Sequence, residues 1–143
     1  MKILPPGSEI IISTEKNKLN LDLVIDFISH SYWAKGRSRE AIETGIKNSI
    51  CFGIYLNSNQ IGFARVLSDF TTIAYLMDVF IIEAFRGYGL GQKFINEIIS
   101  YKDFRSVKKW LLSTKDAHSL YKEFGFAPVQ KPEYMMEMFP QTE

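Results

Sequence analysis

The sequence predicts one domain of the α/β class (α+β type), in which about four helices flank a mixed, mostly antiparallel sheet of about seven strands. Three observations lead to this prediction. Stretches with strand-like and helix-like periodicity follow one another along the chain. Residues 72–82 form an apolar run long enough for a strand buried on both faces. A stretch with three glycines then precedes a helix. The 143 residues suit a single domain, 1–143, with a sizeable core.

The N-terminal part of the chain predicts one strand and two helices. Residues 9–16 are a β-branched run typical of a strand. Residues 20–33 carry apolar side chains at helical spacing, and Asn20 can cap this helix. Residues 36–49 predict a second, shorter helix, for which Ser38 is the plausible cap.

The middle of the chain predicts three consecutive strands. Residues 50–56 and 61–67 are apolar, and the four polar residues 57–60 between them suit a hairpin turn. Residues 72–82 follow after another short polar segment. Because this third strand is apolar on both faces, we expect it to lie at the centre of the sheet.

The C-terminal part predicts two helices and three further strands. Residues 90–101 carry one apolar stripe, which is typical of a helix lying on a sheet. Residues 107–114 predict a strand, and residues 115–124 predict a short helix that ends before a glycine. Residues 125–129 and 134–139 are interpreted as closing strands.

The charges of the chain nearly cancel. Its 17 basic and 16 acidic residues give a net charge of +1, which offers no electrostatic case for nucleic acid or a membrane as partner. Cys51 is interpreted as a core residue, and His30 and His118 have no companion at ligand spacing, so no metal is expected. No apolar stretch reaches the roughly 20 residues of a membrane span, and nothing resembles a signal peptide. We therefore expect a cytoplasmic protein.

The glycine stretch suggests a phosphate-binding loop. The dinucleotide pattern G-x-G-x-x-G fails because the third glycine, Gly91, comes one residue early. The nucleoside-triphosphate loop fails because Gln92 separates Gly91 from Lys93. A third pattern fits residues 86–91. In it, a long strand is followed by Arg or Gln, any two residues, Gly, any one residue, Gly or Ala, and then a helix. There the backbone N–H groups and the helix dipole favour an anion, and glycines allow it to come close.

Two motifs together resemble the GNAT superfamily of acyl-CoA-dependent N-acyltransferases, and the resemblance covers most of the chain. The first is the strand and loop VFIIEAFRGYGLG, residues 79–91, and the second is TKDAHSLYKEFGF, residues 114–126. The resemblance implies acetyl-CoA as co-substrate, with the main chain of the strand pairing with the pantetheine arm. Two positions depart from the family pattern: Thr114 stands where Asn is frequent, and Glu83 stands where Pro is frequent. The implied cofactor-binding residues are Val79, Phe80, Ile81, Arg86, Gly87, Tyr88, Gly89, Leu90, Gly91, Thr114 and Tyr121.

Acyl transfer to an amine requires a neutral amine, a donor to the oxyanion and a proton for the leaving thiolate. The resemblance implies direct attack by the amine and makes Tyr121 the candidate general acid. Asp78 is the candidate general base, since it is the only charged residue in the strand. A buried carboxylate must be paired, hydrogen-bonded or raised in pKa. A raised pKa would suit a base, whereas a structural Asp held by Arg is the alternative. Tyr75 or a water chain is a further possibility.

The resemblance places residues 31–40 in the wall of the acceptor site. Tyr32 and Trp33 could stack on the acceptor there. Arg65 and Asp69 could line the same cleft or pair with each other. The alternative is an ordinary exposed loop between two helices. Three more basic residues of the segment could receive a carboxylate: Lys35, Arg37 and Arg39.

The sequence thus predicts an N-acetyltransferase that moves an acetyl group from acetyl-CoA to a primary amine of a small molecule. Two alternatives are an acyl-CoA-binding sensor without turnover and a protein or peptide N-acetyltransferase. We expect a monomer or a homodimer, for which the cluster of Met135, Met136 and Met138 could join the subunits. The sequence does not indicate which amine is the acceptor.

Overall fold

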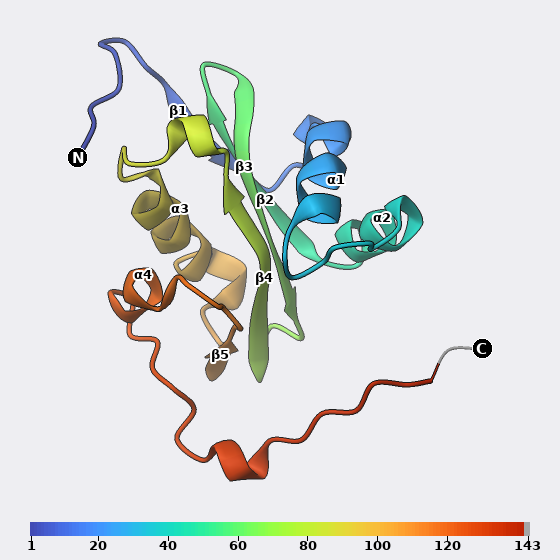
Figure 1. Cartoon of the computed structure of the whole chain (residues 1–143). Coiled ribbons are helices and arrows are strands. Elements are labelled where there is room, and N and C mark those ends of the chain that lie inside the picture. Colours follow the sequence, from blue (N-terminus) through green and yellow to red (C-terminus); the bar gives the residue numbers. More distant parts are fainter. Residues whose placement is uncertain (142–143) are drawn as a thin grey trace. The chain divides into compact units, whose positions relative to one another are not determined.

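The computed structural model describes residues 1–141, which fall into two compact units (Figure 1). The first unit, Met1–Ser113, contains the whole sheet and three α-helices. The second begins at Thr114 and contains one short α-helix. Among the described residues, none of the helices is both long and apolar enough to cross a membrane.

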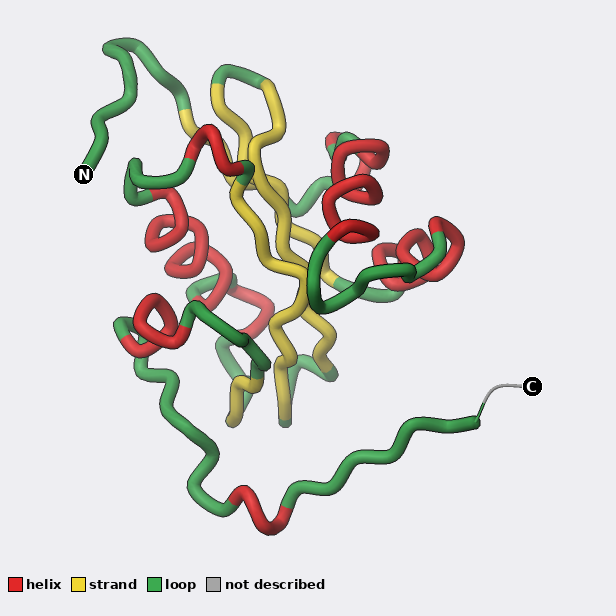
Figure 2. Tube along the Cα trace, in the orientation of Figure 1, coloured by secondary structure: helices red, strands yellow, loops and turns green. Residues whose placement is uncertain are grey.

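The first unit is built on a five-stranded sheet in the order β1-β2-β3-β4-β5 (Figure 2). The first four strands pair antiparallel in chain order, and short turns join β2 to β3 and β3 to β4. The last strand pairs parallel to β4. The strands are β1 (Ile10–Ser13), β2 (Ile50–Leu56), β3 (Asn59–Ser68), β4 (Ile73–Ile81) and β5 (Lys109–Leu111).

Helices cover both faces of this sheet. In Figure 1, α1 (Leu21–His30) and α2 (Arg39–Lys47) lie on one face, and α3 (Leu90–Ile99) lies on the other. The two expected caps are present: Asn20 Oδ1 accepts from the N–H of Leu23, and Ser38 Oγ accepts from the N–H of Ala41. These caps satisfy backbone donors that a helix start would otherwise leave unpaired.

The apolar stripes of the helices form the core. On one face, Phe80 of β4 stacks on Phe27 of α1 with ring centroids 3.9 Å apart, and the Phe63 ring lies 6.1 Å from Phe80. Cys51 belongs to this core, and its burial raises the pKa of the thiol to about 11. On the other face, α3 buries one stripe of side chains: Leu90, Phe94, Ile95 and Ile98.

The second unit is a single helical turn followed by an irregular arm. The helix α4 (His118–Lys122) is shorter than expected, and Gly125 follows it with φ +93°, the left-handed conformation expected just past a helix end. The Tyr121 ring is buried and meets the Phe126 ring edge to face, with centroids 5.8 Å apart. After Phe126 the described chain has one 3-10 turn, Pro132–Tyr134.

The predicted count of about seven strands was too high, since residues 125–129 and 134–139 form no strand. Two physical reasons account for the error. Pro128 and Pro132 lack an N–H and interrupt any hydrogen-bonding ladder. The apolar side chains of the second segment also have no sheet face to cover, as Met136 is 94% and Phe139 83% exposed. An apolar alternating run therefore predicted a strand that the tertiary structure does not form.

Truncation of Phe63 tests the core. Its side chain is fully buried between the sheet and α1, so Phe63→Ala leaves a cavity and should lower the free energy of unfolding by about 3–4 kcal/mol. Urea unfolding followed by circular dichroism measures this change. The matched control is Phe139→Ala at an exposed site, where a change within about 0.5 kcal/mol is expected. Equal losses in the two variants would contradict the assigned core.

Candidate functional site

Strand β4 contains a bulge at Asp78. Phe63 of β3 faces Phe80, whereas Arg65 faces Met77, so β4 carries one more residue than β3 between these pairs. Asp78 adopts φ +53°, in the left-handed region that Asp tolerates better than bulkier residues. A bulge bends its strand and re-aims the adjacent side chain and peptide groups. The sequence offered one signal for it, a single Asp in an apolar strand.

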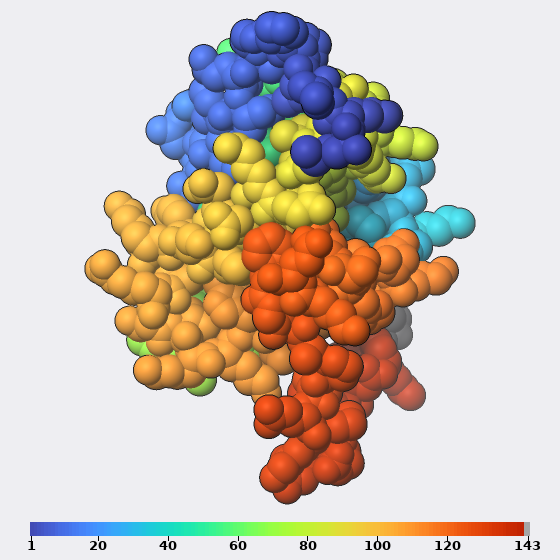
Figure 3. All heavy atoms as spheres, turned by 90° about the vertical axis from the view of Figure 1, so that its left-hand side faces the viewer, coloured from blue at the N-terminus to red at the C-terminus, as the bar shows by residue number. Residues whose placement is uncertain are grey.

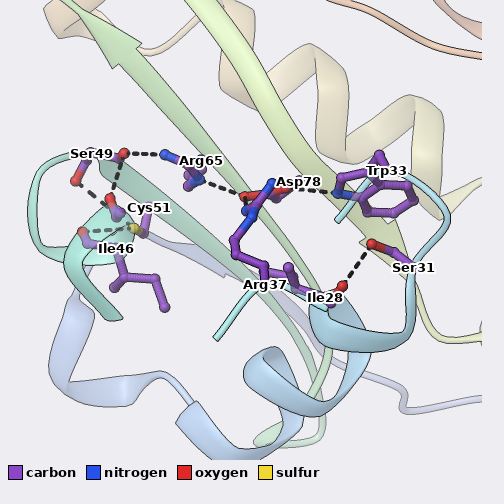
Figure 4. Close-up of polar contacts among 10 residues, drawn as sticks. Ile28, Ser31, Trp33, Arg37, Ile46, Ser49, Cys51, Arg65 and Asp78 are labelled. Carbon is purple, nitrogen blue, oxygen red and sulfur yellow. Dashed lines mark hydrogen bonds and ion pairs between the residues drawn. The ribbon is translucent and has the colours of Figure 1, made fainter. Parts of the chain in front are cut away.

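The Asp78 carboxylate is buried and bound by three donors (Figure 4). Arg65 donates from Nε to Oδ2 at 2.6 Å, and Arg37 donates from Nη1 to the same oxygen at 3.0 Å. Trp33 donates from Nε1 to Oδ1 at 2.7 Å. Both carboxylate oxygens are therefore occupied, and the side chain is only 2% exposed.

The pKa of Asp78 is lowered, not raised. Burial alone would raise this pKa, but the hydrogen bond and charge of Arg65, the charge of Arg37 and the hydrogen bond from Trp33 outweigh it. The first alternative that the sequence left open, a raised pKa that would suit a general base, is therefore contradicted for Asp78. The second alternative, an Asp held by Arg, describes the observed contacts.

The network extends from Asp78 into the segment between α1 and α2. Trp33 and Arg37 both lie in this segment, so the carboxylate fixes it against the bulge of β4. On the other side, Arg65 donates from Nη1 to Ser49 Oγ at 3.0 Å. The Tyr32 ring meets the Trp33 ring edge to face at 5.2 Å. The predicted acceptor residues Tyr32, Trp33 and Arg65 thus lie together in this structure.

Two charged residues that the sequence suggested for the acceptor site, Asp69 and Arg39, form other contacts in the structure. Asp69 does not pair with Arg65: Oδ1 of Asp69 accepts from the N–H groups of residues 71, 72 and 73, which closes the turn between β3 and β4. These hydrogen bonds lower the pKa of Asp69. Arg39 forms ion pairs with Asp22 and Glu43, at exposed positions. Of the basic residues of the segment, Arg37 is the one that joins the network, which the sequence did not single out.

Most of strand β4 has an unpaired edge. The pairing with β5 involves only Ile73, Ala74 and Tyr75, so from Leu76 to Ile81 the β5-side edge of β4 has no strand partner among residues 1–141. Figure 2 shows β5 beside one end of β4 only. Main-chain N–H and C=O groups at such an edge are ready to pair with an extended ligand. The residues Val79, Phe80 and Ile81 belong to this edge.

The glycine loop follows that open edge directly. Gly87 and Gly89 have φ +87° and +74°, which side chains rarely adopt, and α3 begins immediately after Gly89. In the described part of the chain no side chain caps α3, so its first N–H groups are available to an anion. Arg86 donates from Nε to the Ile81 carbonyl at 2.9 Å, which fixes the loop to the end of β4. This geometry can hold a phosphate group.

The N-terminal residues lie against the same loop (Figure 3). The N–H of Lys2 donates to the Gly87 carbonyl at 2.8 Å, and Lys2 Nζ lies 5.6 Å from the centre of the Tyr88 ring. The ammonium group of Lys2 therefore adds positive charge beside the loop. Sequence reasoning missed this residue, because nothing local links it to a segment some 85 positions away.

The remaining candidates occupy separate places. The Tyr75 hydroxyl lies 3.1 Å from Ser113 Oγ. In the second unit, Thr114 Oγ1 accepts from the N–H of Ala117 and so closes the turn before α4. His30 Nδ1 contacts the Asp26 carbonyl at 2.7 Å. Within residues 1–141, no group of three or more His, Cys, Asp or Glu side chains is placed to hold a metal ion.

Comparisons with known proteins agree on one family. A family model described as an acetyltransferase (GNAT) domain matches residues 47–128. The uncharacterized N-acetyltransferase ycf52 of Pyropia yezoensis is 30% identical over 137 residues, which cover 92% of this chain and 76% of that protein. A crystal structure assigned to the GNAT family, from Xanthomonas campestris pv. campestris, is 33% identical with a TM-score of 0.88, covering 92% of this chain and 94% of that one.

A more distant structure is similar in fold alone. It is an acetyltransferase from Clostridium acetobutylicum that was crystallised with acetyl-CoA. It is 12% identical to this chain with a TM-score of 0.66, and the match covers 92% of this chain and 96% of that one.

Replacement of Asp78 tests the role of the network. Because Asp78→Asn leaves Arg37 and Arg65 without their counter-charge, we expect the free energy of unfolding at pH 7 to fall by about 2 kcal/mol. The lowered pKa means that the wild-type stabilisation is fully present above the unfolded pKa of about 4. It is lost as the pH falls through the folded value, so the two proteins should converge toward pH 3.

Urea unfolding at pH 7 and pH 3 measures both effects. The control is Asp22→Asn, at an Asp whose side chain is 87% exposed and paired with Arg39, where little change is expected. Equal stability of Asp78→Asn and wild type at pH 7 would show that the network contributes nothing to the fold.

Proposed function

Because this chain belongs to the GNAT family of acetyltransferases, we propose that it transfers the acetyl group of acetyl-CoA to a primary amine of a small molecule, by direct attack within a ternary complex. One observation carries this proposal: the unpaired edge of β4 leads directly into a glycine loop at the start of α3. An extended arm with amide groups that ends in a pyrophosphate matches these two features in order.

The main chain of β4 would bind the pantetheine arm. Val79, Phe80 and Ile81 would present N–H and C=O groups to its amides, as an added strand does. The Phe80 side chain is packed on Phe27, so its peptide group is held by the core. A donor fixed in this way loses little freedom when it meets an oxyanion. Acetyl-CoA, when bound, supplies an activated thioester carbonyl.

The loop would bind the pyrophosphate. Backbone N–H groups at the start of α3 would donate to its oxygens, and the helix dipole adds favourable potential. Lys2 would add a cation at the same place. A Cβ at either left-handed glycine would be strained, so this cradle depends on glycine. The proposed phosphate-binding residues are Lys2, Arg86, Gly87, Tyr88, Gly89, Leu90 and Gly91.

Tyr121 is the proposed proton donor to the leaving thiolate, and Thr114 is a proposed cofactor contact. Both assignments come from the family resemblance of residues 114–126. Asp78 is a weaker candidate for the general base than the sequence indicated, because its carboxylate is saturated by three donors and its pKa is lowered. We assign it a positioning role, and the proton of the amine would leave through Tyr75 or water.

A thiol-release assay tests the proposal. Acetyl-CoA is incubated with the protein and a panel of primary amines, and free coenzyme A is detected with a thiol reagent. Isothermal titration of acetyl-CoA without an amine measures binding separately. Amine-dependent release supports the transferase. Tight binding without release for every amine would instead favour a sensor, and release only with peptides would favour a peptide acetyltransferase.

Gly89→Val tests the loop. A branched residue is strained at φ +74°, and its Cβ would lie 2.9 Å from Met1 Sδ, so the loop must shift and the Kd for acetyl-CoA should rise at least about tenfold. The matched control is Gly7→Val, which imposes the same left-handed strain at φ +83° in open space, and which should leave the Kd unchanged. An unchanged Kd in the Gly89 variant would show that the loop does not bind the cofactor.

Tyr121→Phe tests the proton donor. Loss of the hydroxyl should lower kcat about 100-fold while the Kd for acetyl-CoA changes little, since the ring and its packing on Phe126 are retained. Tyr134→Phe, at an exposed tyrosine, serves as the control and should keep full activity. An unchanged kcat in Tyr121→Phe would show that Tyr121 has only a packing role.

A further inference from the structure

The cluster around Asp78 carries an excess positive charge. Two guanidinium groups, those of Arg37 and Arg65, share one carboxylate. Among residues 1–141, no other acidic side chain forms an ion pair with either arginine. Since Arg65 is only 11% exposed and Arg37 only 27%, water screens this charge poorly. A half-buried site with one net positive charge favours an anionic ligand.

The two arginines differ in what they can still bind. Arg65 already uses Nε for Asp78 and Nη1 for Ser49. Within residues 1–141, the side chain of Arg37 forms one hydrogen bond, from Nη1 to Asp78 Oδ2, and Arg37 is the more exposed of the two arginines. Its other guanidinium donors, Nε and Nη2, therefore remain for a ligand. Their planar arrangement matches the two oxygens of a carboxylate.

The surroundings of Arg37 define the rest of the ligand. Trp33 is fixed by its hydrogen bond to Asp78 and is 39% exposed. Its ring, with the Tyr32 ring edge to face against it, is therefore held by the same carboxylate as the Arg37 guanidinium. A phosphate would bring about two charges to a cluster with one charge to neutralise, whereas a carboxylate brings one. The chain as a whole, with a net charge of +1, also offers no broad basic surface for a polyanion.

We propose that the acceptor amine carries a carboxylate, as an amino acid does, and that Arg37 binds this carboxylate beside the bulge of β4; this rests on the proposed function. Asp78 then has a defined task. It holds the guanidinium of Arg37 and the ring of Trp33 in place without neutralising the whole cluster. Arg37 is a specificity-determining residue, and Asp78 is a positioning residue.

Matched pairs of acceptors test the proposal. L-phenylalanine is compared with L-phenylalaninamide, and β-alanine with β-alaninamide, in the thiol-release assay. The amide forms have the less basic amines, so near pH 7 a larger fraction of their amine is neutral and able to attack, and in the absence of a carboxylate site the acids should have no advantage. We expect kcat/KM for at least one acid to exceed that of its amide by at least about tenfold.

Arg37→Gln should remove this preference. We expect kcat/KM for the acid to fall at least about tenfold, mainly through KM, while the value for the amide stays the same. Arg37→Lys, which keeps the charge but not the fork, should retain part of the preference. Arg39→Gln is the control, because Arg39 is bound to Asp22 and Glu43 and lies outside the cluster. Asp78 keeps Arg65 and Trp33 as partners in the Arg37 variants, so these should fold.

The outcomes separate this proposal from the proposed function. Turnover of the amides equal to or better than that of both acids overturns the carboxylate site and leaves the transferase intact. A preference for the acids that survives in Arg37→Gln likewise overturns the role of Arg37. Absence of both acetyl-CoA binding and thiol release with every amine overturns the proposed function, and this inference with it.

Discussion

A single buried carboxylate, that of Asp78, connects the bulge of β4 to β3 and to the segment between α1 and α2. It accepts hydrogen bonds from Arg65, Arg37 and Trp33, and each partner comes from outside its own strand. The residue also sits in the left-handed conformation that the bulge requires. Backbone geometry and side-chain binding are therefore coupled at one position: the bulge aims the carboxylate, and its three donors stabilise the bulge. The position of the segment between α1 and α2 depends on this arrangement.

The other half of the candidate site is the edge of β4 that has no strand partner among residues 1–141. Its pairing with β5 stops at Tyr75, and the free edge that results is continuous with the glycine loop. Open edges are a hazard for most sheets because they attract other chains. Here β5 ends at Leu111, so the edge of β4 beyond Tyr75 has no strand partner among residues 1–141, and an extended ligand can pair with it. The α3 start at the end of this edge adds the site for an anion.

The sequence predicted the parts of the fold that depend on short-range patterns. Asn20 and Ser38 were predicted as caps from their residue type just before a helical pattern, and in the structure each accepts from an N–H three residues further along. The stripe of α3 and the glycines before it were likewise local signals. The prediction was wrong for residues 134–139, where strand-like alternation exists but the side chains cover nothing. At Asp78 the sequence left a raised pKa and a carboxylate held by Arg as alternatives, and the structure has the second, with Arg37 and Arg65 as the partners that no local pattern could identify.

The sequence by itself determined the fold class, the helix boundaries near their caps, and the loop that resembles a cofactor-binding motif, because periodicity and backbone freedom are properties of consecutive residues. Only the tertiary structure decided which residues meet. Trp33 and Asp78 are 45 positions apart, and Arg37 and Asp78 are 41 apart. No local pattern distinguishes Arg37 from Arg39, yet one joins the buried carboxylate and the other pairs at the surface. That difference arises from the packing of the segment between α1 and α2 against a bulged strand, which places Arg37 and not Arg39 beside the buried carboxylate.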